Sequence, residues 1–164
     1  MASETDKLRR EQALTLFQEA YQHQVRGEFD EAVELYKRSI ELFPTAEGHT
    51  FLGWTYSFQG HLDDAIQECL RAIEVDPSFG NPYNDIGAYL VEKGKLDEAI
   101  PWFERALEAP RYENYCFPHF NLGRVYESKR LFRRALVEYK KAQAENPQHL
   151  GARRALGRLQ AMSN

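Results

Sequence analysis

The feature that most constrains the fold is a segment of about 34 residues, 46–79, whose pattern predicts two amphipathic helices joined at Gln59-Gly60. In the first helix, one face repeats at i, i+3, i+4 and i+7 through His49, Leu52, Gly53 and Tyr56. In the second helix, the corresponding face consists of Leu62, Ala65, Ile66, Cys69, Ala72 and Ile73. A pair this short cannot bury its apolar faces alone, so it requires copies of itself as neighbours.

Those copies are present along most of the chain. Gly53 recurs as Gly87 and Gly123, and the small residue at 65 recurs at Ala32, Ala99 and Ala135. Ala72 returns as Ala106 and Ala142, and Pro77 as Pro44 and Pro147. This pattern of small, aromatic and proline positions at a period near 34 resembles the tetratricopeptide repeat (TPR) family over about 135 of the 164 residues.

The resemblance implies an all-α fold, a right-handed α-solenoid of four TPR helix pairs plus a C-terminal capping helix. We expect a single domain over residues 1–164, with repeats at about 13–45, 46–79, 80–115 and 116–149 and the cap at 148–162. The first helix, from about residue 6 to 26, begins about two turns early and caps the other end. The third-to-fourth link is two residues longer than the others, which predicts a changed twist or a bulge.

Composition narrows the class of protein. No run of about 18 apolar residues is present, so we expect no membrane span. The first residues lack the apolar core of a signal peptide, so we expect a cytoplasmic protein. Two cysteines do not make a disulfide framework. Cys69 lies on an apolar helix face and is predicted to be buried, whereas Cys116 is expected in a loop at a helix start, where it can be reached.

The net charge of −4 conceals a marked segregation. Residues 1–121 carry 11 basic and 22 acidic side chains, whereas residues 122–164 carry 10 and 3. Most of these charges form solvated faces, but the two ends of the chain attract different partners at long range.

Each first helix of a repeat has a second surface, which in TPR proteins lines the concave groove. The resemblance therefore implies a peptide-binding groove that includes Phe17, Tyr21, Phe51, Trp54, Phe58, Asn84, Asp85, Phe120, Asn121, Arg124, Arg154 and Arg158. Thr50, Ala88 and Phe117 occupy further groove positions.

The aromatic residues of helix 46–59 indicate a binding surface independently of the resemblance to TPR proteins. Phe51, Trp54 and Phe58 recur at i, i+3 and i+7 on a different side from the hairpin face, so the helix is apolar on two sides. One side packs inside its hairpin, and the remainder is an exposed patch of the kind that marks interaction sites. Core packing between repeats is the alternative for Phe51 and Phe58, whereas Trp54 is expected to face the groove.

Two polar signals accompany the aromatic patch. Asn84 and Asn121 lie on successive groove helices, where each amide can pair with a peptide's backbone N–H and C=O groups. Arg124, Arg154 and Arg158 would favour an acidic group at the C-terminal end of the groove. Unrelated surface asparagines and ordinary solvated arginines are the alternatives.

The leading hypothesis is a non-catalytic adaptor or scaffold that binds a partner protein's peptide or helix in the groove. Co-chaperone TPR domains grip a terminal carboxylate with lysine, asparagine and arginine at fixed positions. In this sequence those positions read Phe17, Tyr21, Phe51, Asn81 and Asp85, or, one repeat later, Thr50, Trp54, Asp85, Phe117 and Asn121. Neither set makes a carboxylate clamp, so binding to such chaperone tails is not expected.

Other functions fit the sequence less well. A self-assembling protein is the structural alternative, with the acidic body and basic C-terminus joining head to tail into a homo-oligomer. Nucleic-acid binding would depend on the basic terminal segment alone, which carries no recognition motif. Catalytic activity and a bound cofactor are not expected, because no phosphate loop or catalytic arrangement is present. A metal site is not expected either, because the histidines lack metal-ligand spacing: His23, His49, His61, His119 and His149.

Overall fold

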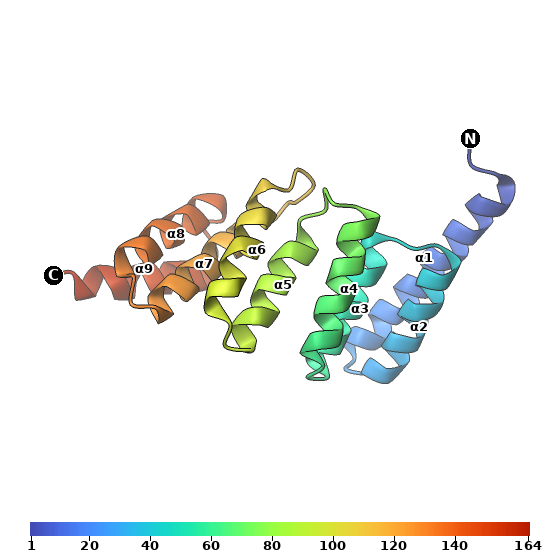
Figure 1. Cartoon of the computed structure of the whole chain (residues 1–164), viewed down its shortest axis with the longest axis horizontal. Coiled ribbons are helices and arrows are strands. Elements are labelled where there is room, and N and C mark those ends of the chain that lie inside the picture. Colours follow the sequence, from blue (N-terminus) through green and yellow to red (C-terminus); the bar gives the residue numbers. More distant parts are fainter.

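The computed structural model describes residues 1–164 and consists of nine helices. They are α1 (Glu4–Val25), α2 (Phe29–Leu42), α3 (Ala46–Phe58), α4 (Leu62–Val75), α5 (Asn81–Glu92), α6 (Leu96–Glu108), α7 (Cys116–Ser128), α8 (Phe132–Glu145) and α9 (Leu150–Met162). The helices follow one another along the long axis, and the two termini lie at opposite ends of the molecule (Figure 1). The predicted all-α solenoid is therefore confirmed.

Contacts between helices show which side of the solenoid is continuous. The hairpins α1–α2, α3–α4, α5–α6 and α7–α8 each pack internally and against the next hairpin, and α9 packs on α8. Contacts between second neighbours join α1 to α3, α3 to α5 and α5 to α7. The first helices of the repeats therefore form one wall that runs along the molecule.

The repeating glycines mark where the two helices of a hairpin approach most closely. A methyl group added at Gly87 would lie 2.5 Å from the Phe103 ring, and one at Gly123 would lie 2.5 Å from the Tyr139 ring. At Gly53 the nearest atom would be the backbone oxygen of Ala65, at 2.9 Å. The small residues that the sequence repeats are thus required by helix contact within each hairpin.

The helix-to-helix turns share one backbone conformation. Gly27, Gly60 and Gly94 have positive φ angles of 77°, 80° and 76°, the left-handed region that ends many helices. The fourth turn adopts the same conformation with Arg130, at φ 61°. Because a side chain in this region crowds the following carbonyl, the fourth turn carries backbone strain that the other three avoid.

Cys116 differs from its prediction. It is the first residue of α7 rather than a loop residue, and it is 5% exposed, packed with Ala142 and Ala152. Burial raises the pKa of its thiol, so it is neither reachable nor reactive. Cys69 is fully buried, as predicted.

The longer link between the third and fourth repeats folds back on the preceding loop. The N–H of Arg111 donates to the Ser78 carbonyl, and the N–H of Gly80 donates to the Arg111 carbonyl, both at 3.0 Å. The Arg111 guanidinium bonds Asp76 and Glu47 and lies 4.2 Å from the centre of the Phe79 ring. The extra residues are therefore held against α3 and α4 and do not form a free bulge.

Substitution of two glycines should test the close-approach role. Gly123→Ala should lower the free energy of unfolding by about 1–3 kcal/mol, because the new methyl must displace the buried Tyr139 ring. Gly157→Ala is the matched control, since that position in α9 has no atom within 4 Å and alanine favours a helix by about 1 kcal/mol. Urea denaturation of both variants measures the difference, and a shift of both in the same direction would contradict the prediction.

The fourth turn offers a second test. Arg130→Gly should raise the free energy of unfolding by about 1 kcal/mol, because glycine adopts φ 61° without the crowding of a Cβ atom. Arg130→Ala removes the charge but keeps the Cβ atom, so its unfolding temperature should stay close to that of the native chain. Thermal unfolding of the two variants separates backbone strain from charge, and equal stabilisation by alanine would refute the strain argument.

Candidate functional site

The residues expected in the groove lie on the four helices of the continuous wall and on α9. Phe17 and Tyr21 lie on α1, and Phe51, Trp54 and Phe58 lie on α3. Further along are Asn84 and Asp85 on α5, Phe120, Asn121 and Arg124 on α7, and Arg154 and Arg158 on α9. The structure separates them into an aromatic cluster at α1–α3, a central pocket at α3–α5–α7 and a terminal pocket at α7–α9.

In the aromatic cluster, Phe51 is a packing residue and Trp54 is a surface residue. Phe51 is half-buried and meets the rings of Phe17 and Tyr21 at centroid distances of 5.1 and 5.9 Å. Trp54 packs edge-on against Phe51 and is 40% exposed. The cluster therefore joins the first two repeats through Phe51 and presents Trp54 outward.

Phe58 lies beside Trp54, as its spacing predicts, with the two ring centroids 5.3 Å apart. It is the last residue of α3 and stacks on Phe29, at the start of α2, with a centroid distance of 5.3 Å and an interplanar angle of 3°. It does not line the central pocket. Phe58 therefore packs between the first two repeats, which is the alternative stated for it, and remains 52% exposed.

The central pocket has a volume of about 360 Å³ and opens between α3, α5 and α7. Its lining is aromatic and amide-rich and consists of Thr50, Phe51, Trp54, Asn81, Asn84, Asp85, Tyr112, Asn114 and Phe117. Tyr112 and Asn114 belong to the longer link and were not predicted as site residues. The only sequence signal for them was the extra length of that link, because their position depends on how it folds back.

Asn84 and Asn121 come together but not as two separate peptide clamps. The Asn121 side-chain amide donates to the side-chain oxygen of Asn84 at 3.1 Å. One donor and one acceptor of the pair are thus already used. The two asparagines form a bridge between α5 and α7, which leaves the Asn121 side-chain oxygen as an acceptor for a ligand.

Asp85 is the only charged residue in the lining of the central pocket. Burial raises the pKa of its carboxyl to about 7, and a hydrogen bond from Asn84 offsets part of this effect. No lysine, arginine or histidine forms an ion pair with it. The pocket therefore holds a carboxyl group that ionises near neutral pH without a cation beside it.

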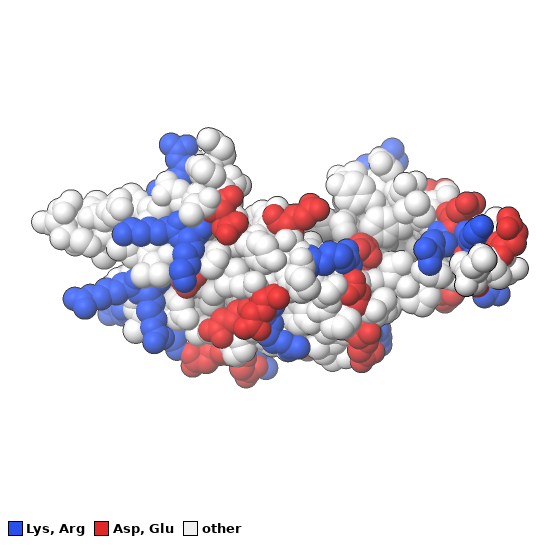
Figure 2. Space-filling view, turned by 90° about the horizontal axis from the view of Figure 1, so that it is seen from above, with Lys and Arg blue, Asp and Glu red and all other residues white.

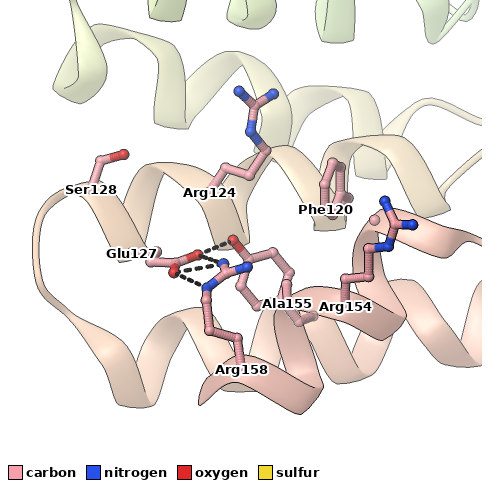
Figure 3. Close-up of a pocket in the computed structure, with 9 residues that line it drawn as sticks. Phe120, Arg124, Glu127, Ser128, Arg154, Ala155 and Arg158 are labelled. Atoms are coloured by element: carbon pink, nitrogen blue, oxygen red, sulfur yellow. Dashed lines mark hydrogen bonds and ion pairs between the residues drawn. The ribbon is translucent and has the colours of Figure 1, made fainter. Parts of the chain in front are cut away.

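The terminal pocket, of about 520 Å³, lies between α7, α8 and α9 (Figure 3). Here Arg158 bonds Glu127 at 2.7 and 2.8 Å, and the Tyr139 hydroxyl donates to Glu127 at 2.6 Å. Burial opposes ionisation of Glu127, but these hydrogen bonds still lower its pKa. The charge of Arg158 is therefore already paired within the chain, and its role toward a ligand stays a prediction.

Arg124 and Arg154 are different from Arg158. Neither forms an ion pair, and the Arg124 guanidinium lies 5.9 Å from the centre of the Phe120 ring. In Figure 3 Phe120 lies between them, and both guanidinium groups point away from the Glu127–Arg158 pair. The predicted basic end of the groove is thus reduced to two available arginines.

Charge on the whole surface follows the segregation seen in the sequence. Lysine and arginine gather over the C-terminal helices, whereas acidic side chains lie over the middle and at the N-terminal end of the molecule (Figure 2). None of the nine helices is long and apolar enough to cross a bilayer. No group of three His, Cys, Asp or Glu side chains is placed to hold a metal ion.

A row of helical hairpins with a continuous inner wall defines an α-helical repeat protein. The sequence profile of the tetratricopeptide repeat matches residues 17–78 and again residues 52–114. These matches cover more than half of the chain, which belongs to the tetratricopeptide repeat family.

Individual relatives are more distant. The chain is 31% identical over 108 residues to the photosystem I assembly protein Ycf3 of Prochlorococcus marinus, and the match covers 59% of this chain and 62% of Ycf3. It is 29% identical over 83 residues to heat shock protein STI1 of Saccharomyces cerevisiae, covering 49% of this chain and 14% of that protein. The chain thus spans less than two thirds of these relatives.

Solved structures share the fold at low sequence identity. The Pseudomonas aeruginosa pilF structure superposes with a TM-score of 0.88 at 20% identity and covers 94% of this chain and 70% of that chain. YrrB, described as a TPR protein with an unusual peptide-binding site, has a TM-score of 0.68 at 21% identity, with 99% and 85% covered. At this identity the likeness concerns the fold alone.

Replacement of the central carboxyl should change how stability depends on pH. The native pKa of Asp85, about 7, exceeds the usual value of 3.8, so the folded state binds the proton more tightly. Stability should therefore fall as pH rises from about 4 to 7 and then level off. Asp85→Asn should remove this loss, which corresponds to as much as about 4 kcal/mol at pH 8 and vanishes near pH 4.

Urea denaturation at pH 4.5 and pH 8 measures this effect. Asp64→Asn provides the control, because Asp64 is exposed on α4. A stability gain for Asp85→Asn that is equal at both pH values would show that the carboxyl does not ionise in the pocket.

Proposed function

We propose that this chain is a non-catalytic adaptor that holds a peptide or helix of a partner protein against its inner wall. TPR domains generally serve as interaction modules between proteins, and this family membership supports the general class. The observation that carries the specific proposal is Trp54, which is 40% exposed at the mouth of the central pocket although it is a large aromatic residue. Exposed tryptophan beside a concave pocket is typical of binding hot spots.

The chemistry of the wall suits a polypeptide ligand. Asn81, Asn84 and Asn114 surround the central pocket with amide groups that can bond a peptide backbone without reading its sequence. Trp54 and Phe117, which is 44% exposed, supply apolar contact on α3 and α7. Arg124 and Arg154 would receive an acidic group of the ligand toward the C-terminal end.

The catalytic and self-assembly alternatives have less support. The repeat fold is generally non-catalytic, and the chain's histidines make pairwise contacts within hairpins, such as His49 with Glu68 at 2.7 Å and His119 with Glu138 at 2.8 Å. Head-to-tail assembly needs an acidic surface at the first helix to meet the basic last helices. The start of α1 instead mixes both signs, with Lys7, Arg9 and Arg10 beside Glu4 and Asp6. Groove binding is therefore the function that the geometry favours.

A library of random peptides displayed on phage and selected on the immobilised native chain tests the proposal. Trp54→Ala should weaken a selected peptide by about 2 kcal/mol, or about 30-fold in Kd, because it removes the exposed anchor of the pocket. Trp102→Ala is the matched control, since Trp102 lies on α6, outside the inner wall, and packs against Tyr83 and Arg105. Its Kd should stay within about twofold of the native value.

Isothermal titration calorimetry measures both affinities, and circular dichroism confirms that both variants are folded. Trp54 also contacts Phe51 and Phe58, so the Trp54→Ala variant should lose some thermal stability while remaining folded at 25 °C. Equal weakening by the two tryptophan variants would contradict a binding site at the central pocket, and so would a library that yields no peptide.

A further inference from the structure

We infer that the central pocket selects a basic side chain of the bound segment, a lysine or arginine whose charged end pairs with Asp85 between Trp54 and Phe117. This inference rests on the proposed function and names the chemistry of its ligand. The placement follows from the order of helices: Asp85 lies on α5, which packs between α3, with Trp54, and α7, with Phe117. The lining residue that carries the charge therefore comes from the helix between the two that carry the aromatic residues.

The carboxyl group in the central pocket has no positively charged partner within the chain. Asp85 is the only charged residue among the nine that line it, and no basic side chain of the chain pairs with it. A carboxylate shielded from water is unfavourable unless it is paired with a cation or fully hydrogen-bonded. Elsewhere the chain supplies such partners, since Glu127 has Arg158 and Asp76 has Arg111. At Asp85 the partner has to come from a ligand.

The aromatic sides of the pocket suit the same ligand. A lysine or arginine is attracted to the face of an aromatic ring, most strongly to tryptophan. The chain uses this contact repeatedly, with Arg105 lying 4.6 Å from the Trp102 ring centre and Arg10 lying 4.6 Å from that of Phe43. Neither Trp54 nor Phe117 has a lysine or arginine of the chain over its ring, although both are exposed. Phe117 meets the His149 ring in a T-shaped contact at a centroid distance of 5.7 Å and is still 44% exposed. Their faces remain available to a basic side chain that enters from solvent.

The sign of the charge changes along the inner wall. The carboxyl of Asp85 on α5 is followed by the unpaired guanidinium groups of Arg124 on α7 and Arg154 on α9. A segment with a basic residue at the central pocket and an acidic residue toward α9 matches both charges. The reversed placement puts like charges together at both sites. Electrostatic complementarity of this kind selects the partner and the direction in which it lies.

The titratable groups that face Asp85 do not compete for the cation. They are Cys69 on α4, Tyr89 on α5 and Tyr112 in the link, and burial raises the pKa of all three, so they stay neutral between pH 6 and pH 8. The other lining residues of α3 and α7 carry no titratable group. Ionisation of Asp85 is therefore the change that would alter binding of a basic side chain over this range.

Pairs of synthetic peptides test the inference. Peptides selected from the phage library on the native chain should share a lysine or arginine at one position. One peptide is then made with lysine and with norleucine, which keeps the four side-chain carbons of lysine but lacks the charged ammonium. Both peptides are titrated calorimetrically into the native chain and the Asp85→Asn variant. On the native chain norleucine should weaken binding by about tenfold or more, and on Asp85→Asn by less than about twofold. Asp64→Asn, which alters an exposed carboxyl on α4, should behave like the native chain.

The pH dependence gives an independent readout. Affinity for the lysine peptide should rise between pH 6 and pH 8 as Asp85 ionises, whereas affinity for the norleucine peptide should not rise. Peptides that need Trp54 but show no basic position would overturn this inference and leave the proposed groove intact. The inference would also be overturned if the change from lysine to norleucine weakened binding equally on the native chain and on the Asp85→Asn variant. A library that yields no peptide would instead contradict the proposed function itself and this inference with it.

Discussion

The structure depends on the close approach of two helices in each hairpin. At Gly87 and Gly123 the first helix lies so near the second that an aromatic ring, of Phe103 or Tyr139, occupies the space of the absent side chain. These rings are almost completely buried, and so are the alanines that face the first helices, such as Ala99 and Ala135. Each hairpin is therefore a closely packed pair of helices, and such pairs stack on one another in one direction.

The inner wall follows from that stacking. Because first helices contact first helices, their side chains share a single surface from α1 to α7. Residues that face neither the partner helix nor the next repeat are left on this surface, and Trp54 is one of them. Phe51, only three positions away, is instead used to join α1 to α3. Phe51 and Trp54 lie on one helix, but Phe51 is half-buried between repeats and Trp54 is 40% exposed.

The pocket at the centre of this wall combines features that do not favour stability. The Asp85 carboxyl is partly buried and has no cation beside it. The longer link between the third and fourth repeats is held by Arg111, and its residues Tyr112 and Asn114 complete the lining. Natural proteins tend to depart from the most stable arrangement at functional sites. The pairing of Glu127 with Arg158 in the terminal pocket shows the opposite situation, in which a buried charge is satisfied within the chain.

The sequence by itself determined the repeat, the helix pairs and the helices that form the wall. These depend on periodic small and apolar residues, whose spacing is a local property that each repeat displays independently. The spacing of Phe51, Trp54 and Phe58 also indicated a second apolar face on their helix, because every third or fourth residue of a helix lies on one face. The groove positions of Asn84 and Asp85 were implied by the resemblance to TPR proteins.

Only the tertiary structure decided how those side chains are used. It placed Cys116 in the core, stacked Phe58 on Phe29, joined Asn121 to Asn84 by a hydrogen bond and paired Arg158 with Glu127. It also brought Tyr112 and Asn114 to the central pocket. Each of these outcomes depends on a contact between residues of different helices or loops. Helical periodicity specifies the face of a residue, whereas the partner that it meets there is set by the packing of neighbouring elements.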